Sequence, residues 1–325
     1  MKILFFKSPV MVWDGTIREL QAEFPETKFI PQDKITDADI ADAEAFVGVA
    51  PHGIIEKAEN LRIIFINFTG SDLLPMDLIR ERGIRLSNTH GNARFVAERA
   101  IAMTLAFYGK IMSFHNDLKE GKWHGIFGGG GTSDSWESLY EKKCAVIGTG
   151  EIGKWTAHYL SMFGCGITGV KNSPAPEGID NFDRVATDLR KAVKDNEIIF
   201  ITLPLTVKTR RIFSREILSA MNDKFLVNIG RGEVIDEKGL FDSLKNGILK
   251  GAALDVWFDY PAMDSSRKYP SKYPFHELEN VIFSPHVGGS AAKASVINLE
   301  QTVENIRAYI KTGIPVFEVN IKREY

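Results

Sequence analysis

Short runs of apolar residues alternate with longer amphipathic stretches along the chain. The apolar runs have the length of buried strands, and the stretches between them place apolar residues at helical spacing. One block of this alternation contains KILFF, AFVGV, RIIFI and IRLS, and a second contains CAVIG, GITGV, IIFITL, FLVNIG, GAALDV and VIFS. Strands that alternate with helices are typical of parallel sheets, so the pattern predicts the α/β class in both blocks.

The boundary between the two blocks is marked by a longer helical pattern. From Ala93 to Leu118 a broad apolar stripe predicts one long helix, with the stripe formed by Val96, Ala100, Met103, Leu105 and Phe107. The polar, Gly-rich stretch GKWHGIFGGGGTSDSWESL follows and breaks the helical period. We therefore expect two α/β units that meet near this helix.

Composition narrows the class of protein. A chain of 325 residues fits two domains of ordinary size. With 44% hydrophobic and 25% charged residues, the chain has the composition of a water-soluble globular protein. The formal charge of −2 gives no bias toward nucleic acid, and no apolar run approaches the roughly 20 residues of a membrane span. Cys144 and Cys165 lie in apolar runs, which indicates free thiols and a cytoplasmic protein.

A glycine motif indicates a dinucleotide site. Gly148, Gly150 and Gly153 form G-x-G-x-x-G between a predicted strand and a predicted helix. Glycine allows a sharp turn and close approach to a pyrophosphate, and the helix N-terminus supplies amide donors. The alternative, a tight turn without a ligand, is less consistent with the strand GITGV that follows.

The end of that following strand bears on the choice of dinucleotide. NAD sites usually carry an acidic residue there, which binds the ribose hydroxyls. This chain has Lys171, Asn172 and Ser173 instead. A cation and two neutral donors suit a 2′-phosphate, so the sequence favours NADP, and NAD stays open as a second choice.

Two further residues fall at the ends of predicted strands. Arg231 follows the strand in NIGRGEVID, and His286 follows the strand in FSPHVGGS. In an open parallel sheet, ligands bind beyond the carboxyl ends of the strands. An arginine there can bind a carboxylate in bidentate fashion, and a histidine can exchange a proton during hydride transfer.

As a set, these motifs make the chain resemble the D-isomer-specific 2-hydroxyacid dehydrogenases over nearly its whole length. The resemblance rests on GTGEIG, LPLT, NIGRGEVID, GAALDVW and SPHVGGS, and extends to FTGSD and SNTHGNARFVAERA in the first half. It implies a flavodoxin-like substrate-binding domain, residues 1–93 and 288–325, into which a Rossmann-type dinucleotide-binding domain, residues 94–287, is inserted. It also implies an active site between the domains and a homodimer.

The resemblance also assigns roles to individual residues. It makes Arg231 the carboxylate-binding residue and His286 the acid/base. Further substrate contacts are expected from Thr69, Gly70 and Asn92. The cofactor would be bound by Gly148, Gly150, Glu151, Ile152, Gly153, Lys171, Asn172, Ser173, Leu203, Pro204, Thr209, Ile229, Gly230 and Asp255. No spacing of histidines with other ligand types indicates a metal site.

One position departs from the family pattern. The family places a glutamate that pairs with the histidine where this chain, aligned on Asp255 and Pro261, has Tyr260. A tyrosine can orient an imidazole through a hydrogen bond but brings no charge at neutral pH. Asp259 is adjacent, and neighbouring residues of an extended segment point to opposite sides. Either Tyr260 faces His286 and acts in the place of the glutamate, or a rearrangement brings Asp259 to the histidine.

The function implied is an NADP-dependent interconversion of a 2-oxo acid and a D-2-hydroxy acid, as in glyoxylate or hydroxypyruvate reductases. One alternative is a formate-dehydrogenase-like enzyme, whose family branch resembles this chain in DVWF and also carries a neutral residue at the Tyr260 position. A second is a non-enzymatic cofactor sensor similar to the C-terminal binding proteins.

Overall fold

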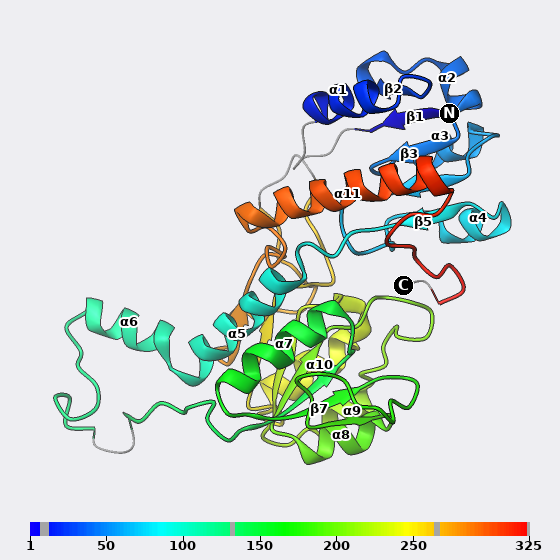
Figure 1. The fold of residues 1–325 in the computed structure, drawn as a ribbon. Helices are drawn as coiled ribbons and strands as arrows, with labels where there is room; N and C mark the ends of the chain where they lie inside the picture. The colour runs from blue at the N-terminus through cyan, green and yellow to red at the C-terminus, as the bar shows by residue number, and fades with distance from the viewer. Residues whose placement is uncertain (7–12, 131–133, 263–266, 324–325) are drawn as a thin grey trace. The chain divides into compact units, whose positions relative to one another are not determined.

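The computed structural model describes residues 1–6, 13–130, 134–262 and 267–323. The chain divides into two compact units (Figure 1). Unit 1 consists of Met1–Asn92 and Ser290–Tyr325, and unit 2 of Ala93–Gly289. Unit 2 is therefore one continuous segment, whereas unit 1 is assembled from both ends of the chain.

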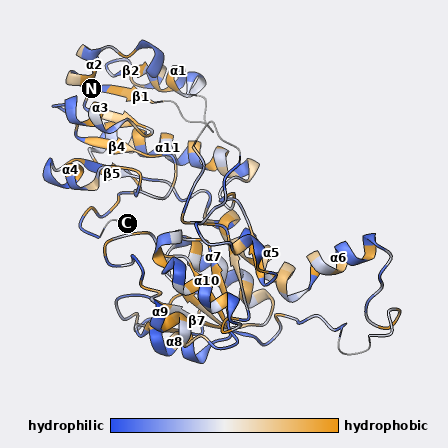
Figure 2. Cartoon of the chain, turned by 180° about the vertical axis from the view of Figure 1, so that it is seen from behind, coloured by the Kyte–Doolittle hydropathy of each residue, from blue (hydrophilic) through white to orange (hydrophobic). Residues whose placement is uncertain are grey.

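Unit 1 is built on a five-stranded parallel sheet with the order β2-β1-β3-β4-β5. This is the strand order of flavodoxin-like folds. The strands are β1 (Lys2–Phe5), β2 (Lys28–Pro31), β3 (Ala45–Val47), β4 (Ile63–Phe65) and β5 (Arg85–Ser87). Helices cover both faces, and the central strands β3 and β4 are wholly buried and hydrophobic (Figure 2). The helices are α1 (Asp14–Glu23), α2 (Asp37–Asp42), α3 (His52–Lys57), α4 (Met76–Glu81) and α11 (Ala292–Thr312), with a short 3₁₀ helix η1 (Gln32–Lys34).

Helix α11 joins the end of the chain to this sheet. Its apolar side chains Val303, Ile306 and Tyr309 pack in one core cluster with Ile3 and Phe65 of the central strands. Burial of such side chains is the dominant favourable contribution to the stability of a unit of this size. Unit 1 therefore lacks part of its core until residues from the C-terminal segment are in place.

A local charge network fixes the start of helix α2. Thr36 and Asp39 form a capping box, and Lys2 of strand β1 binds the Asp39 carboxylate at 2.9 Å. The hydrogen bonds from Thr36, together with the Lys2 ammonium, lower the pKa of Asp39 to about 2.

Unit 2 contains a seven-stranded parallel sheet with the order β12-β11-β10-β9-β6-β7-β8. Counted from its first strand, this extends the 3-2-1-4-5-6 order of Rossmann folds by one strand. The strands are β6 (Lys143–Ile147), β7 (Gly166–Val170), β8 (Arg184–Ala186), β9 (Ile198–Ile201), β10 (Phe225–Asn228), β11 (Gly251–Leu254) and β12 (Val281–Phe283). The helices are α5 (Ala93–Tyr108), α6 (Ile111–Lys119), α7 (Glu151–Met162), α8 (Leu189–Asp195), α9 (Arg215–Ser219) and α10 (Glu237–Lys245), with 3₁₀ helices η3 (Gly232–Val234) and η4 (Phe275–Glu277). The α/β prediction is confirmed.

The prediction of one long helix from Ala93 to Leu118 was wrong. Helix α5 ends at Tyr108 and α6 begins at Ile111, because Lys110 adopts the left-handed conformation with φ 49°. Gly109 allows this break, since a Cβ there would lie 2.7 Å from the Leu105 carbonyl oxygen. Continuous apolar spacing across Gly109 concealed it.

Helix α6 extends away from the other helices of unit 2 (Figure 1). None of its residues is buried. It and the segment that follows expose large apolar side chains, including Ile126 at 91% and Phe127 at 87%. His124 holds the segment against α6 because its ring nitrogens contact Asp117 at 2.9 Å and Asp134 at 3.1 Å. We call residues 111–130 the apolar arm. No helix in the described ranges has the length and hydropathy needed to cross a membrane.

Candidate active site

The glycine motif forms the turn from strand β6 into helix α7. Gly148 has φ 109°, a conformation that L side chains rarely adopt, and a Cβ there would lie 2.6 Å from Thr202 Oγ1. A Cβ on Gly153 would lie 2.0 Å from the Gly148 carbonyl oxygen. Both positions therefore require glycine for the strand and the helix to approach this closely.

Gly150 stands apart from the other two glycines of the motif. It is the N-cap residue of α7 and has no side chain to accept a hydrogen bond from the helix, and a Cβ added to it meets nothing within 4 Å among the described residues. Open space in front of uncapped amide donors at a helix N-terminus is what a pyrophosphate requires. The turn thus fits a dinucleotide, with Glu151 and Ile152 as the first residues of the helix.

Lys171, Asn172 and Ser173 lie directly after strand β7. Asn172 and Ser173 are exposed, and the Lys171 side chain is half-buried. Within the described part of the chain, the Lys171 ammonium and the Ser173 hydroxyl make no hydrogen bond or ion pair. Their polar groups are available to a ligand at the end of β7.

The segment after strand β9 carries the residues expected at the middle of the cofactor. Leu203 approaches the neighbouring strand end so closely that a Cβ on Gly230 would lie 2.4 Å from its carbonyl oxygen. Thr209 is buried, and its hydroxyl donates to the Pro204 carbonyl at 2.6 Å. That hydroxyl therefore shapes the loop that follows β9. Ile229 is likewise buried, next to Gly230.

Arg231 lies three residues beyond the end of strand β10. Asn228 fixes this turn, since its side-chain amide donates to the Arg231 carbonyl at 3.0 Å and its side-chain oxygen accepts from the Gly230 N–H at 3.1 Å. The Arg231 guanidinium is half-buried, and its Nη1 donates to the Gly230 carbonyl at 2.9 Å. A guanidinium has five N–H donors, so it can also bind a carboxylate.

His286 lies three residues beyond the end of strand β12, on an exposed loop. It is one of few non-glycine residues with positive φ, at 57°. Such a conformation costs free energy and persists only where neighbouring contacts enforce it. The enforcing contacts come from Asp255, which follows β11, the strand paired with β12.

Asp255 holds the His286 loop from both sides. Its side chain is only 2% exposed. One carboxylate oxygen accepts from Ser284 Oγ and from the Val287 N–H at 3.0 Å, and the other accepts from the Gly288 N–H at 2.9 Å. The sequence reasoning assigned Asp255 to the cofactor and not to the histidine. In the structure its carboxylate is bound to the segment that carries His286.

Tyr260 and Asp259 point to different partners. The Tyr260 ring lies beside the His286 ring, with a centroid distance of 5.5 Å and an interplanar angle of 53°. The Asp259 carboxylate is 50% exposed and pairs with Lys268 at 2.6 Å. Of the two arrangements that the sequence left open, the structure has Tyr260 at the histidine.

Trp257 links the loops described above. Its indole N–H donates to the Ser284 carbonyl at 2.8 Å, and its backbone N–H donates to the Tyr260 hydroxyl at 3.1 Å. A Cβ on Gly232, next to Arg231, would lie 2.0 Å from the Trp257 carbonyl oxygen. The loops that carry Arg231, Tyr260 and His286 are therefore packed around one buried residue. The motif DVW showed an aromatic residue here but not its hydrogen bonds.

The predicted substrate residues of unit 1 lie after strands β4 and β5. The Thr69 hydroxyl is 2.9 Å from the Thr89 carbonyl oxygen and 3.0 Å from Asn92 Oδ1. Gly70 follows Thr69 on the same half-buried loop. Thr69, Gly70 and Asn92 thus form one group within unit 1.

The sequence matches a known family over this region. Residues 101–288 match the family described as D-isomer specific 2-hydroxyacid dehydrogenase, NAD binding domain. The chain belongs to this family. The match covers strands β6 to β12, and so includes the glycine turn, Arg231, Asp255, Tyr260 and His286. The resemblance inferred from the motifs is thereby confirmed.

The curated relatives of this chain include reductases and dehydrogenases. Hydroxypyruvate reductase of Thermotoga maritima is 34% identical over 74% of this chain and 75% of that protein. Glyoxylate/hydroxypyruvate reductase A of Arabidopsis thaliana is 30% identical over 82% of this chain and 82% of that protein. D-3-phosphoglycerate dehydrogenase of Methanocaldococcus jannaschii is 31% identical over 89% of this chain, but the match spans only 53% of that longer protein.

Solved structures share the fold of the whole chain. The 2-hydroxyacid dehydrogenase from Ketogulonicigenium vulgare Y25 superposes with a TM-score of 0.75 at 25% identity, over 98% of this chain and 97% of that one. A glyoxylate reductase from Paecilomyes thermophila gives a TM-score of 0.81 at 20% identity, over 99% and 98%. These superpositions show the fold, including a Rossmann-type unit, and membership of the family makes the protein an NAD(P)-dependent oxidoreductase.

Proposed function

We propose that the protein reduces a small 2-oxo acid, of the glyoxylate or hydroxypyruvate type, to the D-2-hydroxy acid with NADPH. The observation that carries the proposal is the grouping of Arg231, Tyr260 and His286 around Trp257 at the carboxyl ends of β10, β11 and β12. A carboxylate-binding cation and a proton donor beside a dinucleotide turn suit this reaction. The names of the two reductase relatives support the substrate class.

Each residue has a distinct task in this mechanism. The Arg231 guanidinium binds the substrate carboxylate and holds the adjacent carbonyl in place. The reduced nicotinamide, when bound, supplies the hydride to the carbonyl carbon. The protonated His286 imidazole gives its proton to the carbonyl oxygen, which becomes the hydroxyl of the product. We also assign Thr69, Gly70 and Asn92 of unit 1 to the substrate.

Tyr260 takes the place of the family's glutamate but supplies no charge. Its ring limits the rotation of the His286 imidazole, and its hydroxyl is held by the Trp257 N–H at 3.1 Å. Lys268 fixes the neighbouring segment through Asp259 at 2.6 Å and the Tyr260 carbonyl at 3.2 Å. Without a carboxylate at this position, the protonated imidazole receives less electrostatic stabilisation than in the family pattern.

The preference for NADPH rests on the residues that follow β7. Lys171 and Ser173 offer a cation and a hydroxyl donor where an NAD site carries an acid. In this proposal, the remaining contacts to the cofactor come from the glycine turn, the loop after β9 and the end of β10. NAD binds more weakly than NADP.

We also propose that the protein is a cytoplasmic homodimer. Its apolar arm exposes several large apolar side chains, and exposed apolar surface of this kind on soluble proteins marks interaction sites. Both cysteines are buried free thiols, which suits a reducing compartment.

Steady-state kinetics with glyoxylate and hydroxypyruvate, each with NADPH and NADH, test the function. We expect turnover of at least one 2-oxo acid and a preference for NADPH. A charge-assisted hydrogen bond contributes about 1.5–3 kcal/mol, so Lys171→Asp should reverse the preference by roughly tenfold to a hundredfold. Lys57→Asp, on the exposed surface of α3, is the matched control and should leave it unchanged.

Three outcomes contradict the proposal. Tighter binding of NADH by the unaltered protein rejects the assignment of Lys171 and Ser173. Oxidation of formate without reduction of any 2-oxo acid identifies the formate-dehydrogenase-like alternative. Cofactor binding without turnover of either kind identifies a non-enzymatic sensor.

A further inference from the structure

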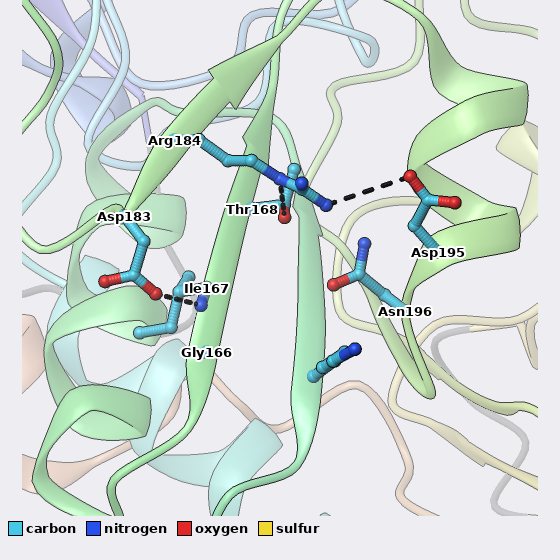
Figure 3. A pocket seen from close by; sticks show the side chains of 8 residues that line it. Gly166, Ile167, Thr168, Asp183, Arg184, Asp195 and Asn196 are labelled. Carbon is cyan, nitrogen blue, oxygen red and sulfur yellow. Dashed lines mark hydrogen bonds and ion pairs between the residues drawn. The ribbon is translucent and has the colours of Figure 1, made fainter.

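A cavity lies at the amino ends of the strands of unit 2, the end of the sheet opposite the glycine turn. It is formed where β6, β7 and β8 begin and where α8 ends, and its volume is about 440 Å³ (Figure 3). That volume is within the range of small-molecule sites, roughly 300–1,000 Å³. The residues that line it are Lys143, Gly166, Ile167, Thr168, Asp183, Arg184, Asp195 and Asn196.

Asn196 is a buried polar residue with spare hydrogen-bonding capacity. Its side chain is only 2% exposed, and its amide nitrogen donates to the Ala192 carbonyl at 2.7 Å. Within the described residues its side-chain oxygen accepts no hydrogen bond. This oxygen is accessible from the cavity, so a donor group of a bound ligand can reach it.

Arg184 extends across the upper side of the cavity in Figure 3. Its Nε donates to the buried Thr168 hydroxyl at 2.9 Å, which fixes the guanidinium. Its contact with Asp195 is long, at 3.9 Å, because Asp195 is paired with Lys191 at 2.9 Å. Most N–H donors of Arg184 are thus left for a ligand, and a fixed guanidinium suits a carboxylate.

The remaining charges of the cavity are one cation and one anion. The Lys143 ammonium is exposed and makes no ion pair in the described part of the chain. One Asp183 oxygen accepts from the Ile167 N–H at 2.6 Å, and the carboxylate makes no ion pair there either. The lining therefore offers two cations, two carboxylates and an amide oxygen that accepts no hydrogen bond in the described residues. These groups complement a ligand that carries one positive and one negative charge.

We infer that this cavity binds a small zwitterion, an α-amino acid. Its carboxylate is recognised by Arg184 and Lys143, and its ammonium group by the Asn196 side-chain oxygen within the negative field of Asp183 and Asp195. The site is separate from the proposed function, since it lies at the amino ends of strands whose carboxyl ends lead to the cofactor turn.

Isothermal titration of the full-length protein with glycine, glycolate and acetate tests the inference. Glycolate replaces the ammonium group of glycine with a hydroxyl, and acetate removes it. We expect saturable glycine binding that is roughly tenfold tighter than that of acetate, with glycolate between them. In amide spectra, glycine should shift the signals of Ile167, Arg184 and Asn196.

Two surface variants separate the halves of the ligand. Lys143→Gln should weaken glycine and acetate alike, by roughly threefold to tenfold, while Asp183→Asn should weaken glycine and leave acetate unchanged. The asparagine can still accept from the Ile167 N–H, so the fold is kept. Lys57→Gln is the control and should change neither. Equal binding of glycine and acetate, no saturable binding, or glycine binding unaffected by both variants would overturn the proposal.

Discussion

The Asp255→Asn variant distinguishes a residue that holds the His286 loop from one that binds the cofactor. The asparagine has the shape of the aspartate but only one acceptor oxygen. If that oxygen keeps the contacts with Ser284 and the Val287 N–H, its NH₂ group faces the Gly288 N–H. The variant then loses one hydrogen bond to a charged acceptor and leaves a buried donor unpaired.

The magnitude follows from these two losses. A hydrogen bond to a charged group contributes about 1.5–3 kcal/mol, and an unsatisfied buried donor costs about 1–3 kcal/mol. Allowing for relaxation, the native loop conformation loses about 3–4 kcal/mol relative to relaxed ones, and the left-handed φ of His286 favours that relaxation. The kcat for 2-oxo acid reduction should fall by roughly a hundred- to a thousandfold, because each 1.36 kcal/mol corresponds to a factor of about ten.

The assay compares kcat with the Kd of NADPH, measured separately by fluorescence titration. If Asp255 holds the loop, kcat falls and the Kd changes by less than about threefold. Ser284→Ala is the graded control: it removes a single hydrogen bond to Asp255, so kcat should fall by about tenfold. A near-normal kcat with a much weaker Kd for NADPH would refute the reasoning and return Asp255 to the cofactor.

Three other predictions follow from the structure. Gly150→Ala should fold normally but bind NADPH at least tenfold more weakly. Gly153→Ala should also lower the melting temperature, because of the two added Cβ atoms only the one at Gly153 meets backbone, at 2.0 Å. Equal melting temperatures of the two variants would contradict this. Tyr260→Glu should keep reductase activity to higher pH than the unaltered protein, because a carboxylate favours the protonated imidazole; an unchanged pH–rate profile would count against the contact with His286. The pKa of Asp39 is lowered to about 2, so the stabilising contribution of its carboxylate is present above the unfolded pKa of 3.8 and is lost as pH falls through about 2. The melting temperature of Asp39→Asn should therefore lie below that of the unaltered protein at neutral pH, and the difference should shrink in acid.

The elements that sequence predicted well are those buried on both faces. Strands β9 and β10 are wholly buried, so they appear in the sequence as continuous apolar runs. Strand β8 was missed because it lies at the sheet edge with exposed and half-buried residues only. Strand β2, also at an edge, was missed for the same reason, since only Phe29 of its residues is buried.

The candidate site divides in a similar way. The positions of Arg231 and His286 followed from a general rule about strand ends, and Tyr260 from the register of one motif. The contacts of Asp255 did not follow, because its partners lie on a different strand end about thirty positions along the chain. The hydrogen bond from the Trp257 indole to Ser284 was hidden for the same reason. Sequence patterns report which faces are buried, and they do not report which polar groups meet.

The division of the chain has a consequence for the order of synthesis. All residues of unit 2 precede Ser290, so its sheet can close while the C-terminal segment is still in the ribosome. Unit 1 begins to be made first but is finished last, since Val303, Ile306 and Tyr309 of α11 complete its core. Until α11 has been synthesised, strands β1 to β5 therefore have an uncovered apolar face. A nascent chain stalled before α11 should carry a protease-resistant unit 2 and a unit 1 that chaperones still recognise.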